Sequence, residues 1–417
     1  MSGQETGEAT GSRALPARPE PAYGAKRAAA GSPASPLANH APVAWLVAGL
    51  LALGFAGALV SLAASRNDGA TFDLHGWRDG TLGRQIDRAI DVPYARGLHG
   101  WEAAVRYRLF GDLGLQVMEG CPGWLFYRDG LRPLGDDGGE AATDPLIDAR
   151  IAALDAYASA LRAAGIALVV ATVPDKARVE TDALCGLAQA PVMTRRLARW
   201  QHALDEAGVA HVDLLPALQQ ARPAFYRTDV HWNARGAEAA AQVLATAVLP
   251  RLGTRGDTRF VHAQAPAAPR VGDLLQLAGL ADAPDGWRPA PDVETTETLT
   301  PVRAGGLLDA GPGTEVMLAG SSFSRRSAFA DRLGEQLGRE VWNVSLDDGQ
   351  FDRALHAMWA KRASWPASVR VVIWEMSEDA LSMPVADEPR TGAPQAAANP
   401  PVPAPGAAHE APSARQD

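Results

Sequence analysis

A serine, preceded by a strand-like run, occupies a position suited to nucleophilic catalysis. In VMLAGSSFS, Ser322 stands two residues after Gly320, which ends an apolar run typical of a buried strand. A G-x-S turn between strand and helix presents its serine beside backbone N–H groups that can hold an oxyanion. Ser321 is the intervening residue, and Ser324 takes the place of a second glycine. The alternative is a helix N-cap, for which serine is favoured.

A serine nucleophile needs a base, and His231 is the best placed of the nine histidines. It lies in YRTDVHWNARG, between a predicted strand and a predicted helix that Asn233 can cap. In extended backbone, Asp229 projects to the same side as His231 and can orient its imidazole. The alternative is a solvated surface turn. No H-x-H or H-E-x-x-H motif supplies metal ligands, so we expect neither a metal nor a cofactor.

The elements that must position these residues alternate between strand and helix. Apolar runs predict strands at 166–174, 209–215, 314–320, 340–346 and 369–376, and helical patterns occupy 144–165, 190–207, 233–252, 324–338 and 350–363. This rhythm predicts an α/β fold with a doubly wound sheet and helices on both faces. Reactive residues then gather at the carboxyl ends of the strands. Residues 255–313 lack the rhythm and are interpreted as an insertion near the active face.

The N-terminal part of the chain carries one long apolar segment. Residues 41–65 contain no charge and as a helix would span roughly 37 Å, enough to cross a bilayer. A buried core helix and a cleaved signal peptide are the alternatives. Lys26 and Arg27 favour a cytoplasmic N-terminus, which places the rest of the chain outside the cytoplasm. Residues 1–40 and 384–417 are rich in Ala, Pro and Gly, and we expect a disordered cytoplasmic arm and a disordered tail.

Charge and cysteine content narrow the possible partners. The net charge of −9 is spread along the chain, so nucleic acid is an unexpected partner. Cys121 and Cys185 are the two cysteines. In an oxidising compartment they can form a disulfide, whereas two buried free thiols are the alternative, and the sequence leaves the choice open.

Six motifs occur in an order that resembles a known family. They are GWLFYRDG (123–130), VPDKARV (173–179), DVHWNARGA (229–237), GDLLQLAGL (272–280), GSSFS (320–324) and VIWEMSEDAL (372–381). Together they resemble the periplasmic alginate O-acetyltransferases of the AlgJ and AlgX type, over roughly residues 70–382. The apolar anchor, and the lack of room for a C-terminal carbohydrate-binding module, make the chain more similar to the AlgJ branch.

The resemblance implies a fold and roles for the site residues. It implies a three-layer α/β/α SGNH-hydrolase-like domain over residues 66–383, with a permuted order in which Asp-x-His precedes the serine. Ser322 is then the nucleophile, His231 the general base and Asp229 its orienting partner. Two departures stand out: Ser321 replaces the family's usual threonine after the glycine, and Asn233 replaces a frequent Thr or Ser.

The implied reaction is acyl transfer through an acetyl-serine, with a hydroxyl of an exported polysaccharide as acceptor. A membrane-bound O-acyltransferase is implied as the supplier of acetyl groups. The protein is expected in the inner membrane as a single-pass protein with its catalytic domain in the periplasm. A carbohydrate esterase with the same triad is one alternative, and a non-catalytic scaffold of a polysaccharide secretion complex is another.

Several further residues in these motifs have two interpretations. The tryptophans Trp124, Trp232 and Trp374 either pack in the core, which their apolar neighbours favour, or stack on sugar rings. Lys176 and Arg178 either contact an anionic sugar or lie in a solvated loop. Glu375 is interpreted as a structural partner near the site, and Asn343 as a residue that could face the oxyanion.

Overall fold

The computed structural model describes residues 41–67, 93–133, 139–303, 313–347 and 349–383. The chain divides into two compact units, one before Pro93 and one from Pro93 onward, and each is described by itself. The predicted arm 1–40 and tail 384–417 lie outside the described residues.

In the first unit, α1 (Ala41–Asn67) is a continuous helix. Its stretch Ala44–Ala63 is long and apolar enough, by length and composition, to cross a membrane. None of that stretch is buried, and large side chains such as Trp45, Leu51 and Phe55 are exposed. A buried core helix, the alternative interpretation, does not fit this exposure.

A five-stranded parallel sheet forms the centre of the second unit. Its strand order is β10-β9-β11-β3-β4. The strands are β3 (Ala167–Val173), β4 (Ala210–Asp213), β9 (Val316–Ala319), β10 (Val341–Asn343) and β11 (Val371–Ser377). Because all five run in one direction, the segments after β3, β9 and β11 emerge at the same edge.

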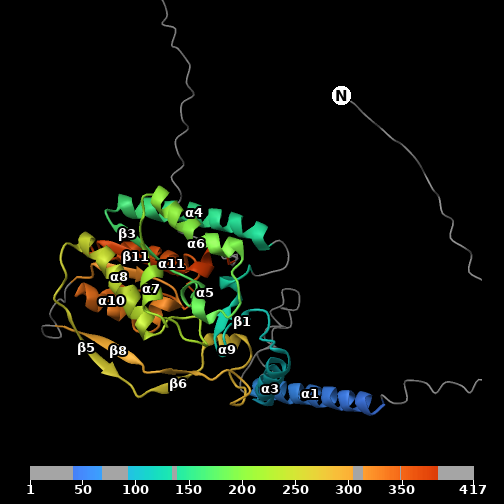
Figure 1. Ribbon diagram of the computed structural model, residues 1–417. Coiled ribbons are helices and arrows are strands. Elements are labelled where there is room, and N and C mark those ends of the chain that lie inside the picture. Colours follow the sequence, from blue (N-terminus) through green and yellow to red (C-terminus); the bar gives the residue numbers. More distant parts are fainter. Residues whose placement is uncertain (1–40, 68–92, 134–138, 304–312, 348, 384–417) are drawn as a thin grey trace, which may run out of the picture. The chain divides into compact units, whose positions relative to one another are not determined.

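Helices cover both faces of this sheet (Figure 1). On one face lie α4 (Gly139–Ala163), α6 (Pro191–Glu206) and α11 (Arg353–Trp359), and on the other lie α7 (Leu215–Gln220), α8 (Ala234–Leu252) and α10 (Phe329–Leu337). Side chains alternate along β3: Leu168 and Val170 pack with the first group, Val169 and Ala171 with the second. The predicted three-layer α/β/α fold is confirmed.

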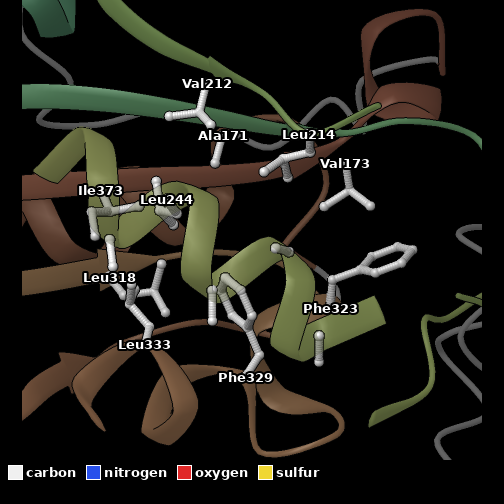
Figure 2. Close-up of a cluster of buried hydrophobic side chains, with 14 of the residues drawn as sticks. Ala171, Val173, Val212, Leu214, Leu244, Leu318, Phe323, Phe329, Leu333 and Ile373 are labelled. Atoms are coloured by element: carbon white, nitrogen blue, oxygen red, sulfur yellow. The ribbon is translucent and has the colours of Figure 1, made fainter. Parts of the chain in front are cut away.

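The hydrophobic cluster between the sheet and the helices α7, α8 and α10 extends to the turn that carries Ser322. Figure 2 shows Ala171, Leu318 and Ile373 of the sheet packed with Leu244 of α8. Phe323 belongs to the same cluster and is buried. Burying such a side chain contributes about 1.5–3 kcal/mol. The residue after Ser322 is therefore an anchor for the turn.

Smaller elements surround the sheet. They are α3 (Pro93–Phe110), β1 (Val117–Glu119), β2 (Leu125–Tyr127), α5 (Lys176–Val179) and the 3-10 turns η3 (Arg128–Gly130), η4 (Thr181–Ala183), η6 (Arg362–Ser364) and η7 (Glu378–Leu381). β1 and β2 pair antiparallel. A disulfide joins Cys121, between β1 and β2, to Cys185, just after η4, which settles the question the sequence left open.

The segment between α8 and β9 forms two antiparallel strand pairs and a short helix. β5 (Arg259–Gln264) pairs with β8 (Glu297–Val302), and β6 (Ala268–Arg270) pairs with β7 (Asp292–Glu294). The helix α9 (Asp273–Leu277) lies between β6 and β7 in the sequence. None of these strands joins the central sheet, and we refer to residues 255–303 as the insertion.

The helix predicted over 324–338 is wrong in its first turn. Residues Ser322–Arg325 form a 3-10 turn, η5, and α10 begins only at Phe329. Ser327 and Ala328 have left-handed backbone, with φ of 53° and 51°, which a continuous helix does not allow. Ser322 therefore lies on a short turn rather than at the start of a long helix.

Candidate active site

The structure brings the three predicted residues together. The Ser322 hydroxyl lies 2.8 Å from His231 Nε2, although 91 positions separate them in the sequence. His231 Nδ1 lies 2.7 Å from Asp229 Oδ1. With the ring proton on Nδ1, His231 donates to Asp229 and accepts from Ser322. The side chains of His231 and Asp229 are 3% and 0% exposed, whereas Ser322 is partly open to solvent.

The Asp-x-His spacing has a local cause. Asp229 Oδ1 also accepts the backbone N–H of His231 at 3.0 Å, so one carboxylate oxygen fixes both the backbone and the ring of this histidine. Asn233 then caps α8 by accepting from the N–H groups of Arg235 and Gly236. A Cβ on Gly236 would lie 2.2 Å from the Ala224 oxygen, so only glycine allows this approach. The interpretation of 229–231 as a solvated turn is wrong.

Glu375, two residues before the end of β11, holds the turn that carries Ser322. Its carboxylate accepts from the Ser321 N–H at 2.7 Å, the Ser321 hydroxyl at 2.8 Å and the Ser324 hydroxyl at 2.7 Å. Burial raises the pKa of Glu375 although these hydrogen bonds oppose it. A Cβ on Gly320 would lie 2.5 Å from the same carboxylate, which explains the glycine. Both flanking serines are structural, and Ser322 is left facing His231.

Phe323 connects the turn to the histidine as well as to the core. Its ring lies 4.9 Å from the His231 ring and 5.1 Å from that of Trp232, measured between centroids. Because Phe323 and Trp232 are buried, the neighbouring Ser322 and His231 are held in register by packing.

The charges around His231 include two groups from the insertion. Arg270 donates to the second oxygen of Asp229 at 2.6 Å, and Asp273 lies 3.2 Å from His231 Nδ1. Burial opposes ionisation of Asp229, but its hydrogen bonds with His231 and the Arg270 charge hold its pKa well below the usual range. Burial lowers the pKa of His231, and the hydrogen bonds to Asp229 and Asp273 outweigh it, so the net pKa is raised.

The donor atoms of Asp229, His231 and Asp273 lie within 4.8 Å of one another, a grouping that could hold a metal ion. The remaining Asp229 oxygen, however, already pairs with the Arg270 guanidinium, and a cation here would sit beside that charge. The other ring nitrogen of His231 faces Ser322. The arrangement therefore suits a proton relay better than a metal centre.

Lys176 and Arg178 lie in α5 and bond to other parts of the protein, so the interpretation as a solvated loop is wrong. Lys176 is buried, and its Nζ donates to the backbone oxygens of Leu125, Arg227 and Asp229 at 2.6, 2.8 and 3.1 Å. Arg178 pairs with the buried Glu378 at 2.7 Å. Three carbonyls that meet in the interior need donors, and a compact ammonium supplies three.

Asn343 and two of the tryptophans are structural. The Asn343 amide donates to the Ser324 oxygen and accepts from the Ser345 N–H, both at 3.0 Å, so it braces the turn rather than facing an oxyanion. Trp232 and Trp374 are fully buried in the core. Trp124 is half-buried beside the Lys176 ammonium, which lies 5.3 Å from its ring centre.

Sequence reasoning missed the roles of Lys176, Arg270 and Asp273. Asp273 lies in the motif GDLLQLAGL, which was noted only for its resemblance, and Arg270 precedes that motif by two positions. The available signal was the presence of two opposite charges, Arg270 and Asp273, only three positions apart in the predicted insertion.

Comparisons with known proteins agree with the geometry. A family model described as SGNH hydrolase-like domain, acetyltransferase AlgX matches residues 117–378. Probable alginate O-acetylase AlgJ of Pseudomonas putida is 30% identical, over 73% of this chain and 81% of its own. The corresponding protein of Azotobacter vinelandii is 29% identical, over 79% and 87%.

A solved structure, the O-acetyltransferase domain of Pseudomonas putida AlgJ, superposes with a TM-score of 0.54 at 29% identity. It covers 66% of this chain and 96% of that domain. The resemblance seen in the motifs is confirmed. The chain belongs to the family of SGNH hydrolase-like, AlgX-type acetyltransferases and is an acyltransferase.

Proposed function

We propose that this protein transfers acetyl groups to hydroxyls of an exported polysaccharide through an acetyl-serine at Ser322. The observation that carries the proposal is the continuous chain of contacts from Ser322 through His231 to Asp229, at 2.8 and 2.7 Å. Such a chain activates a hydroxyl that is otherwise a poor nucleophile at neutral pH.

In the first half-reaction His231 Nε2 takes the proton from Ser322 as its oxygen attacks the carbonyl carbon of an acetyl donor. The tetrahedral intermediate collapses, the leaving group departs with the proton from Nε2, and acetyl-Ser322 remains. Asp229 stabilises the imidazolium formed in between. We assign the backbone N–H of Ser322, at the start of η5, as one donor to the oxyanion, because no acceptor for it is found among the described residues.

In the second half-reaction a sugar hydroxyl gives its proton to His231 Nε2 and attacks the acetyl-serine. The second tetrahedral intermediate releases Ser322, which recovers the proton, and an O-acetylated sugar leaves. Water in place of the sugar would give acetate instead.

The relatives suggest the polymer and the location. The two relatives reported above are described as probable alginate O-acetylases, so alginate is the acceptor we propose. We place the protein in the inner membrane, held by α1 as a single-pass anchor, with its catalytic domain in the periplasm. The disulfide between Cys121 and Cys185 is consistent with an oxidising compartment. A membrane-bound O-acyltransferase is the proposed supplier of acetyl groups.

The test is to incubate the full-length chain in detergent with p-nitrophenyl acetate and mannuronate oligosaccharides, with Ser322→Ala as control. We expect acetylated oligosaccharide with the parent chain and none with the variant. Free acetate alone would make the protein a carbohydrate esterase. Neither product from folded protein would favour a non-catalytic scaffold of a secretion complex.

A further inference from the structure

The insertion is attached to the loop that carries Asp229 and His231. A Cβ on Gly272 would lie 2.1 Å from the Thr228 oxygen and 2.7 Å from the Asp229 nitrogen, so the two backbones are in direct contact. The Leu274 N–H donates to that Thr228 oxygen at 3.1 Å. The start of α9 therefore lies against the catalytic loop.

A second set of contacts comes from β7. Asp292 accepts from the backbone N–H groups of Arg227 and Thr228 at 3.0 and 2.8 Å, and from the Thr228 hydroxyl at 2.6 Å. Glu294 accepts from the Tyr226 hydroxyl at 2.7 Å. Successive residues of the loop are thus bonded to the insertion, which fixes where its charges stand relative to His231.

Two of those charges act on the His231–Asp229 pair, Arg270 on the aspartate and Asp273 on the histidine. The Arg270 guanidinium is shared between Asp229, at 2.6 Å, and Glu294, at 3.0 Å, and lies 4.7 Å from the centre of the Tyr226 ring. Asp273 lies 3.2 Å from His231 Nδ1 and is 40% exposed. The ring proton on Nδ1 therefore meets two carboxylates, while a cation neutralises the nearer one.

We propose that Arg270 and Asp273 are positioning residues that the insertion supplies to the relay. Arg270 turns one oxygen of Asp229 toward His231 and weakens its negative field, and Asp273 gives the protonated imidazole a second carboxylate. This inference rests on the proposed role of His231 as the base for Ser322. It predicts effects of opposite sign, which a purely structural role does not.

The direction in which each substitution moves the pKa of His231 follows from the charge that is removed. Removing the Asp273 carboxylate leaves the imidazolium less stabilised, so the pKa of His231 falls and the base is neutral at lower pH. Removing the Arg270 cation leaves Asp229 a stronger partner, so the pKa of His231 rises. The other charged groups near the pair, Glu294 behind Arg270 and the Lys176 ammonium on the Asp229 carbonyl, stay unchanged in both variants.

The size of the shift in the pKa of His231 depends on how close the removed charge lies and how exposed it is to solvent. A charge within 4–6 Å shifts a pKa by about 1–3 units, and the solvent around Asp273 places its effect near the lower end. At one pH unit below the parent midpoint, a downward shift of about one unit gives roughly a fivefold larger share of the plateau rate.

The experiment measures how fast an aryl sulfonyl fluoride modifies Ser322 in the full-length chain, as a function of pH. This rate depends on the serine and its base and needs neither acetyl donor nor sugar. The variants are Asp273→Asn, Arg270→Gln and Arg270→Lys, which keeps the charge. Arg259→Gln and Asp285→Asn are controls, because both residues lie in the insertion and are exposed.

The rate of Ser322 modification should fall on the acid side of its pH profile as His231 becomes protonated. We expect the midpoint of that fall to move to lower pH in Asp273→Asn and to higher pH in Arg270→Gln. It should stay in place in Arg270→Lys and in both controls. Shifts in the same direction, or none, with a reactive parent chain would overturn the inference and leave the proposed function standing. If Arg270→Gln fails to fold, an unshifted midpoint in Asp273→Asn overturns it alone. A parent chain whose Ser322 does not react would remove the proposed function and this inference together.

Discussion

Lys176 offers a sharp test of how the catalytic loop is held. Its ammonium donates to three backbone oxygens, of Leu125, Arg227 and Asp229, and burial lowers its pKa to about 7. In Lys176→Met the side chain keeps a similar volume and loses all three donors. At about 1 kcal/mol for each hydrogen bond, the loss is about 3 kcal/mol, a large part of the 5–15 kcal/mol that typically stabilises a domain.

The substitution also affects the active site, because one of the three oxygens that lose a hydrogen bond is the backbone carbonyl of Asp229. A shift of that residue by about 1 Å would lower the rate of Ser322 modification by about 100-fold. Thermal unfolding of the full-length chain should show a midpoint lower by about 5 °C. Reactivity with the sulfonyl fluoride is then measured well below that midpoint.

Lys361→Met is the matched control, since Lys361 is exposed and the chain has only three lysines. We expect the parent midpoint and the parent reactivity for it. A Lys176→Met protein that unfolds within about 1 °C of the parent and reacts at the parent rate would refute the role given to this ammonium.

Three further predictions concern the nucleophile turn, the disulfide and pH. Glu375→Met removes the acceptor of three buried donors and should lower the free energy of unfolding by about 3–5 kcal/mol, whereas Glu375→Gln keeps part of the bonding and should lose less, as denaturant titration can show. Cys121→Ser removes a disulfide that spans 64 positions and should lower the free energy of unfolding by about 4 kcal/mol. Adding a reductant to this variant should lower that free energy no further, and an unchanged free energy of unfolding in the variant would contradict the prediction. Because His231 acts neutral and its pKa is raised, kcat/KM for p-nitrophenyl acetate should fall as pH drops through a midpoint above the ordinary value of about 6.5, and a midpoint below that value argues against the relay.

The local pattern of apolar residues was enough to predict the strands of the central sheet. Each of the five apolar runs became a strand, since parallel strands buried on both faces read as continuous apolar segments. The meeting of Ser322 and His231 followed chiefly from the resemblance, because Ser322 comes shortly after β9 whereas His231 lies in the loop between α7 and α8. The strands predicted within 166–174 and 369–376 are neighbours in the sheet: β3 pairs with β11 from Ala167–Val371 to Val173–Ser377.

Contacts that the insertion makes with the rest of the fold, and side-chain bonds to buried backbone atoms, could not be predicted. Lys176 looked like a loop residue because its three acceptors are backbone atoms, which leave no trace in side-chain identity. Arg270 and Asp273 reach the site only through the docking of the insertion on the catalytic loop. The helix predicted from 324 failed because Ser321 and Ser324 bond to the buried Glu375, which draws the turn away from helical geometry.

The most direct measurement is peptide mass spectrometry on the full-length chain, quenched in acid during turnover of p-nitrophenyl acetate. We predict one added acetyl group on the peptide that contains Ser321 and Ser322, with fragment ions that place it on Ser322. It should persist in Ser321→Ala and be absent in Ser322→Ala and in His231→Ala. An acetyl group on Ser321, or one that forms equally well without His231, would contradict the account.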